Sequence, residues 1–112
     1  MTIREMAERL NAKVYAEEDQ MDVDLCGAFS SDMMSDVLAF AEDRDVLITG
    51  LLNPQIVRTA HMQDMSCIVI VRGKSATEEI RTLAAQNDIA LLETDLTMYE
   101  ASGKLYEGGL GR

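Results

Sequence analysis

The chain has 112 residues, of which 47% are hydrophobic, and this length is enough for one domain with a single buried core. Ten basic and twenty acidic residues give a net charge of -10, which argues against binding to nucleic acid or to an anionic membrane. The charged start and the lack of any apolar run near the roughly eighteen residues of a membrane span predict a cytoplasmic protein.

The first segment predicts a helix followed by a short strand. Thr2 can cap a helix, and Glu5 stands where it would complete a capping box. Residues 13–16 then have the pattern of a strand. The next stretch, residues 17–45, holds ten acidic residues and Arg44 as its single basic residue, so it carries nine of the ten net negative charges.

Two further strands and two helices are predicted in the middle of the chain. Residues 24–29 indicate a strand, a turn at Gly27 leads out of it, and Ser30 or Ser31 can cap the helix that follows. Residues 45–50 indicate another strand. Asn53 and the adjoining proline form a strong helix start, because Asn caps and Pro fits the first turn.

The last part begins with the strongest strand signal. The β-branched run at 67–73 is typical of a strand buried on both faces and should be central. Ser75 with Glu78 predicts a second capping box, followed by a strand at 89–94 and a helix at about 96–107. The glycine-rich residues 107–112 are expected to form a flexible tail.

This alternation predicts one α/β domain over residues 1–112, with helices flanking a mostly parallel or mixed sheet of about five short strands, in three layers. Residues 46–95 form two strand–helix–strand crossovers, which should be right-handed and should align three parallel strands. Ligands of such sheets bind beyond the carboxyl ends of the strands. Those ends lie at residues 49–50, 72–75 and 93–95.

One motif fragment at this edge points to an anion. The tetrapeptide RGKS resembles the end of a phosphate-binding P-loop, but the required earlier glycine is Ile68, so a P-loop is excluded. Arg72, Lys74 and free amides at the start of the next helix could still hold one anionic group. The alternative is a helix that is merely well capped.

Other candidate sites have a simpler explanation beside the functional one. Asp32, Asp36 and nearby acids could bind Mg²⁺ or Ca²⁺ or form a solvated face, and the EF-hand spacing is absent. The cysteines, 41 residues apart, indicate reduced thiols and no metal site. His61 could act in catalysis with Asp64 or lie on the surface. We therefore predict no catalytic set, metal or cofactor.

Three stretches resemble the DRTGG domain family. The segment MDVDLCGAFSSDMMSDVLAFA is similar to the family signature, with Gly27, Ser31, Asp32, Ser35 and Asp36 in place, although the signature itself is degraded at 23, 26 and 28. The segments ITGLLNPQIVRTA and LLETDLTMYEASGKLYEGG resemble the middle and the close of the family pattern. The likeness covers essentially the whole chain.

The resemblance implies a fold similar to the amino-terminal domain of HPr kinase/phosphorylase and a regulatory or dimerising role, here as a stand-alone domain. Our first hypothesis is a non-catalytic homodimer that senses a nucleotide or another small phosphorylated metabolite at the carboxyl edge of the sheet. The predicted ligand-binding residues are Gly27, Ser31, Asp32, Thr49, Gly50, Asn53, Arg72 and Gly73.

Two rival hypotheses belong to other classes. An accessory factor would dock a partner enzyme through its acidic face and the helix that contains Met33 and Met34. An enzyme would use Asp32 or His61 as an acid or base.

Overall fold

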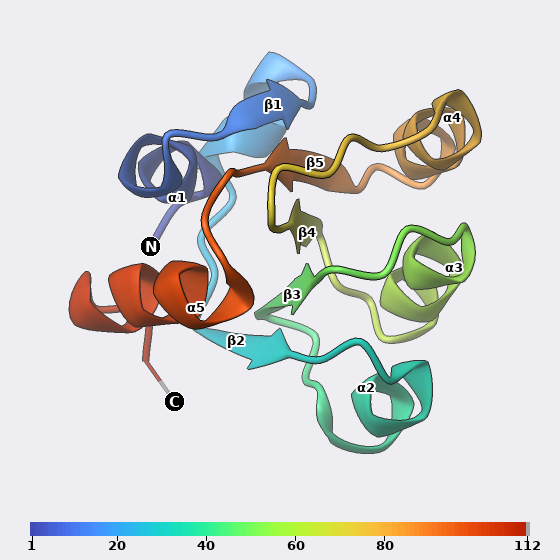
Figure 1. Cartoon of the computed structure of the whole chain (residues 1–112). Coiled ribbons are helices and arrows are strands. Elements are labelled where there is room, and N and C mark those ends of the chain that lie inside the picture. The colour runs from blue at the N-terminus through green and yellow to red at the C-terminus, as the bar shows by residue number, and fades with distance from the viewer. Residues whose placement is uncertain (112) are drawn as a thin grey trace.

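The computed structural model describes residues 1–111 and shows an α/β domain with a five-stranded sheet (Figure 1). In chain order the elements of these residues are α1 (Ile3–Leu10), β1 (Lys13–Tyr15), the 3-10 helix η1 (Glu18–Asp22), β2 (Gly27–Ser30), α2 (Met34–Phe40), β3 (Asp45–Thr49), α3 (Gln55–Met62), β4 (Cys67–Ile70), α4 (Glu78–Gln86), β5 (Ala90–Glu93) and α5 (Met98–Glu107). The predicted α/β class is confirmed.

The sheet is mixed and has the order β1-β5-β4-β3-β2. Strands β2, β3, β4 and β5 run parallel, and β1 pairs with β5 in the antiparallel sense. Strand β4 is the middle strand, as its run of β-branched residues predicted, and Ile68 pairs with Leu47 on one side and Leu91 on the other. The carboxyl ends of the four parallel strands therefore share one edge of the sheet.

Helices cover both faces of the sheet, so the domain has three layers with the sheet in the middle. Figure 1 shows α1 and α5 on one face and α2, α3 and α4 on the other. The side chains of β4 alternate between two cores: Cys67 and Val69 pack with the α1 and α5 layer, and Ile68 and Ile70 pack with the opposite layer. This alternation follows from the two-residue period of a strand and explains why the whole strand is apolar.

Two predicted helix starts are confirmed. Thr2 and Glu5 form the expected capping box at α1. The Oδ1 atom of Asn53 accepts the N–H of Gln55 at 2.8 Å, at the first turn of α3. Both residues therefore satisfy amides that a helix leaves without an intrahelical partner.

Two other predicted caps were wrong. The N-cap of α4 is Thr77, whose side chain accepts the N–H of Ile80, and Ser75 lies in the preceding loop. Among the described residues no side chain caps α2, and the Ser31 hydroxyl instead accepts the N–H of Met33 at 2.9 Å within the turn before the helix. Ser and Thr readily close such local turns, which compete with capping.

The carboxyl-terminal segment is packed rather than a free tail up to residue 111. Helix α5 ends at Glu107, Leu110 is 3% exposed, and its N–H donates to the carbonyl of Leu105. The side chain of Leu110 belongs to the α1 and α5 core. Residue 112 of the predicted tail lies outside the described residues. In residues 1–111, no helix is long and apolar enough to cross a membrane.

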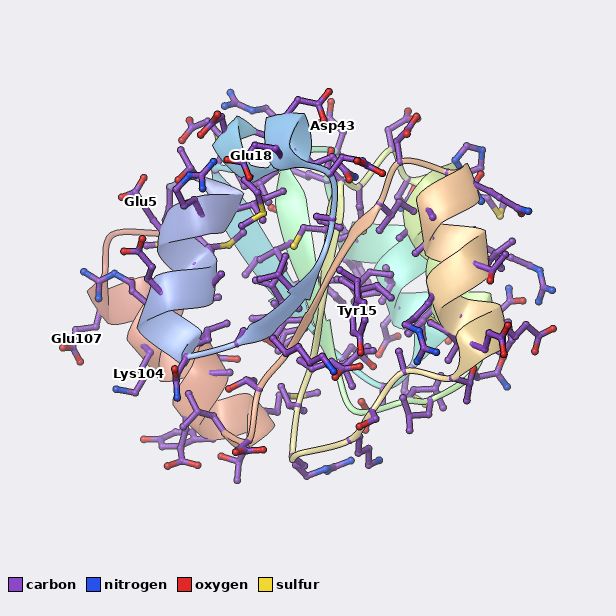
Figure 2. All side chains as sticks on the ribbon, turned by 90° about the horizontal axis from the view of Figure 1, so that it is seen from above. Glu5, Tyr15, Glu18, Asp43, Lys104 and Glu107 are labelled. Atoms are coloured by element: carbon purple, nitrogen blue, oxygen red, sulfur yellow. The ribbon has the colours of Figure 1, made fainter. Side chains whose placement is uncertain are left out.

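Much of the acidic stretch lies at the amino end of the parallel strands. Figure 2 shows Glu18 of η1 and Asp43 before β3 at the same end of the molecule. Glu18 pairs with Arg4, and Asp24 pairs with Arg44. This part of the negative charge is therefore one sheet length away from the carboxyl edge and is partly neutralised.

Candidate functional site

Asp32 links the ends of two neighbouring strands at the carboxyl edge. It follows β2, and its Oδ1 atom accepts the Thr49 hydroxyl at 3.0 Å and the Gly50 N–H at 2.7 Å, both at the end of β3. Parallel strands bring these residues together because β2 and β3 end at the same edge. Thr49 is fully buried, so its hydroxyl has a fixed position.

Arg72 reaches the same place from the loop after β4. Its guanidinium lies against Gly50, where an added Cβ would collide with it, and its Nη2 is 3.9 Å from Asp32 Oδ2. We call Asp32, Thr49, Gly50 and Arg72 the strand-end cluster. It unites four of the predicted site residues, which come from three different loops.

An unusual backbone turn positions Arg72. Arg72 has φ 65° and Gly73 has φ 69°, both in the left-handed region, which glycine tolerates and arginine disfavours. The turn is held because the N–H groups of Arg72 and Gly73 donate to the carbonyls of Leu96 at 2.7 Å and Thr94 at 3.0 Å. The loop after β5 therefore determines where the Arg72 side chain begins.

Lys74 adds a second cation beside the cluster. Its Nζ donates to the Gly50 carbonyl at 2.6 Å, and Lys74 also lines a small pocket of about 210 Å³ with Lys13 and Gly73. The sequence analysis named Lys74 with Arg72 as a candidate for binding an anion but did not include it among the predicted ligand-binding residues. The sequence signal that points to Lys74 is its position in RGKS, directly after the predicted site residue Gly73.

The expected free amides before α4 are not all free. The N–H of Ala76 donates to Glu93 Oε2 at 2.7 Å, so a carboxylate from the end of β5 already occupies this position. Thr77 then accepts the N–H of Ile80. The amides of Ala76 and Ile80 at the start of α4 are therefore already paired and cannot form an anion site by themselves.

The cluster keeps Asp32 ionised. The Gly50 N–H, the Thr49 hydroxyl and the charges of Arg72 and Lys74 lower the pKa of Asp32 below its ordinary value, against a smaller opposing effect of burial. At neutral pH the group is thus an anion that accepts hydrogen bonds.

The remaining predicted residues are apart from the cluster or support it indirectly. Ser31 closes the turn before Met33, and Asn53 accepts the Gln55 N–H just before α3, whose N-cap is Pro54. Gly27 begins β2 and pairs with Asp45 at the amino end of the strands, so the expected turn and the ligand role at the carboxyl edge do not fit its position. His61 is exposed on α3, and the described residues contain no cluster of three potential metal ligands.

A separate groove lies along the open edge of β2. It measures about 620 Å³ and runs between β2 and α5, with Tyr99, Tyr106 and Leu110 among its lining residues. The N–H of Ser31 faces β3, where it donates to Ile48, so alternation along the strand turns the backbone groups of Ala28 and Ser30 toward the open edge. We call this region the β2–α5 groove.

Comparison with known proteins identifies the class of domain. The chain belongs to the DRTGG domain family, whose pattern it matches over residues 5–107. A comparison with curated proteins gives no match.

The fold is also found in a solved structure. The chain is similar to the CBS and DRTGG domains of the regulatory region of Clostridium perfringens pyrophosphatase, determined in complex with its activator, diadenosine tetraphosphate. The TM-score is 0.79 at 19% sequence identity, and the match covers 93% of this chain and 45% of that chain. The present chain thus spans less than half of that regulatory region, and the likeness establishes the fold.

Proposed function

We propose that this domain is a non-catalytic regulatory module that binds a nucleotide or another small phosphorylated metabolite at the carboxyl edge of its sheet. The observation that carries the proposal is the Arg72 guanidinium, held against Gly50 beside the Thr49 hydroxyl. An arginine fork, a backbone amide and a hydroxyl are the groups that bind phosphate oxygens in proteins.

The charge distribution supports an anionic ligand despite the net charge of -10. Glu18 and Asp43 lie at the opposite end of the strands (Figure 2). A four-residue strand is roughly 13 Å long, and charges separated by more than about 8 Å are largely screened at physiological salt. The carboxyl edge itself carries charges of both signs, with Lys13, Arg72 and Lys74 against Asp32, Glu93 and Asp95.

The family and its structural relative support the regulatory part of the proposal. In the pyrophosphatase, the DRTGG domain belongs to a regulatory region that was solved with a nucleotide activator. Asp32 and His61, the acid–base candidates, do not form one site here, because Asp32 follows β2 at the carboxyl edge while His61 lies near the far end of α3. Non-catalytic binding fits this arrangement best.

Titration calorimetry with a panel of nucleotides and sugar phosphates tests the proposal. We expect binding by the wild-type chain and a loss of roughly tenfold or more in affinity for Arg72→Gln, because a charged hydrogen-bond donor to phosphate is removed. Arg58→Gln is the matched control: Arg58 is exposed on α3, and this substitution removes the same positive charge away from the cluster. Equal affinity for both variants, or no binding to any compound at millimolar concentration, would reject the proposed site.

We also propose that the module is a homodimer formed at the β2–α5 groove. Strand β2 is an edge strand, and edge strands with free backbone groups readily pair with another chain. Tyr99 is 87% exposed, and tyrosines are enriched in interfaces. The groove also carries Glu100, Lys104 and Glu107, charges of both signs that a two-fold axis can pair.

A second candidate function is docking of a partner enzyme, favoured by an apolar surface on α2 and α3. Phe40 is 69% exposed and Met62 is 65% exposed, and Met33 and Leu38 are also exposed large apolar residues. We call these four residues the α2 patch. Asp36 and other acids nearby favour a basic partner, so co-purification should be salt-sensitive and should be lost in Phe40→Asp with Asp36→Lys.

A further inference from the structure

We infer that Asp32 is an internal competitor of the ligand: its carboxylate occupies the position that a phosphate group takes when the ligand binds. This inference rests on the proposed function and specifies how the same site works. A bound phosphate would replace the Asp32 carboxylate as the acceptor of the Thr49 hydroxyl and the Gly50 amide. In the unliganded chain, Asp32 therefore occupies the phosphate position.

The hydrogen bonds of the cluster point to this exchange. The Oδ1 atom of Asp32 takes both the Thr49 hydroxyl and the Gly50 N–H, at 3.0 and 2.7 Å, which is how a phosphate oxygen would bind there. Thr49 is fully buried and Gly50 is held by its place at the end of β3, so these donors cannot turn to a second anion elsewhere. A ligand that uses them must displace Asp32.

Arg72 is the group that would gain most from the exchange. Its guanidinium is 3.9 Å from Asp32 Oδ2 and makes no side-chain hydrogen bond within residues 1–111, although five N–H donors are available. A phosphate has more acceptor oxygens than a carboxylate and carries more charge. It could accept hydrogen bonds from the Gly50 amide and the guanidinium at once, whereas the Asp32 carboxylate accepts the amide N–H and forms only a 3.9 Å ion pair with Arg72.

Displacement of Asp32 would release the turn that leads into α2. This turn is held by the Asp32 carboxylate, by the Ser31 hydroxyl and by the Ser31 N–H, which donates to the Ile48 carbonyl, and within residues 1–111 α2 has no side-chain cap of its own. At its other end α2 remains attached, because Gln63 Nε2 donates to the Leu38 carbonyl at 2.8 Å. Ligand binding at the cluster would therefore loosen the start of α2, where Met33 of the α2 patch lies.

Binding of AMP and of inorganic phosphate to Asp32→Ala, measured by calorimetry, tests the inference. We expect roughly tenfold tighter binding than in the wild-type chain, because the competing carboxylate and its repulsion are gone. Asp36→Ala is the matched control, since it removes an exposed acid on α2 that makes no hydrogen bond to the cluster, and its affinity should stay near wild type. In Asp32→Ala, adding Arg72→Gln should abolish the gain.

The outcomes separate the two claims. If wild type binds and Asp32→Ala binds equally or more weakly, the competition is refuted and the proposed function stands. If neither chain binds AMP or phosphate at millimolar concentration, both are refuted. Should Asp32→Ala fail to fold, Asp32→Asn tests the same competition, because it keeps the side-chain shape and removes the charge.

Hydrogen exchange at residues 31–36 should also rise on ligand binding to wild type, and unchanged exchange contradicts displacement.

Discussion

At the scale of single residues, Arg72 contributes to the site at some expense to the fold. A non-glycine residue in the left-handed region costs on the order of 1 kcal/mol and persists only where its surroundings fix it. Arg72 has φ 65°, and it is held by the Leu96 carbonyl. Left-handed residues elsewhere in the described chain are Asn, Asp or Gly, which tolerate this conformation well. Arginine at 72 is therefore best explained by its side chain.

The strain at Arg72 leads to a prediction about stability. Arg72→Gly should be more stable than Arg72→Ala by about 1 kcal/mol, because glycine adopts positive φ without a steric cost and both variants lose the guanidinium. Urea unfolding of the two variants measures the difference. Equal stabilities, or a more stable alanine variant, would contradict a left-handed backbone at this position.

Asp32 should make stability depend on pH in a defined direction. Its pKa is lower in the folded chain than the ordinary value of 3.8, so its contribution is complete above that value and is lost as pH falls through the lower folded pKa. Because the side chain is 46% exposed, we expect only about 1 kcal/mol.

Urea unfolding of wild type and Asp32→Asn between about pH 7 and pH 3 checks this expectation. The wild-type advantage should be constant at the upper end of the range and should shrink at the lower end. An advantage that grows on acidification would reverse the sign of the shift and exclude the ionised cluster.

At the scale of elements, the loops after the strands decide which side chains serve folding and which serve the site. Thr77 caps α4 from within the β4–α4 loop, whereas the Ala76 amide of that loop is met by Glu93 at the end of β5. The Gly50 amide after β3 is likewise met by a carboxylate from another segment, that of Asp32 after β2. A contact between loops is easier to exchange for a ligand than a local cap.

The reassigned cap of α4 gives a prediction at this scale. Thr77→Ala should lower the free energy of unfolding by about 1 kcal/mol, because the Ile80 N–H loses its acceptor. Ser75→Ala should change it by less than about 0.5 kcal/mol, as expected for a loop residue with no capping role. Thermal and urea unfolding measure both variants, and a larger loss for Ser75→Ala would restore the capping box that the sequence favoured.

At the scale of the whole molecule, three surfaces separate by chemistry. The carboxyl edge carries Arg72 and Lys74, the β2–α5 groove carries tyrosines and mixed charges, and the α2 patch is apolar and lies beside Asp36. Figure 2 shows Lys104 and Glu107 reaching outward from α5 at the edge of the molecule. Ligand binding, self-association and partner docking could therefore occur without mutual exclusion.

Self-association at the groove can be tested with two matched tyrosine and phenylalanine variants. We expect a dimer for wild type and a monomer for Tyr106→Glu, because a charge replaces an exposed aromatic residue of the groove. Phe40→Glu adds the same charge at the equally exposed α2 patch and should leave the dimer intact. Sedimentation velocity distinguishes the species, and a dimer that survives Tyr106→Glu but not Phe40→Glu would move the interface to α2.

The sequence by itself determined the order of elements, the central place of β4, the cap at Thr2 and the helix start at Asn53, because hydrophobic period and helix-start signals are local properties. It also brought Thr49, Gly50 and Arg72 to one edge, since parallel strands end together, and the parallel pairing of β2 with β3 in the structure adds Asp32 to them.

Only the tertiary structure decided the antiparallel pairing of β1, the packing of Leu110 and the position of Gly27 at the opposite end. These depend on contacts between segments far apart in the chain. The same holds for the hydrogen bond from the Gly50 N–H to Asp32, 18 residues away. Several acceptors could satisfy this amide, and the sequence does not show which acceptor the fold brings closest to it.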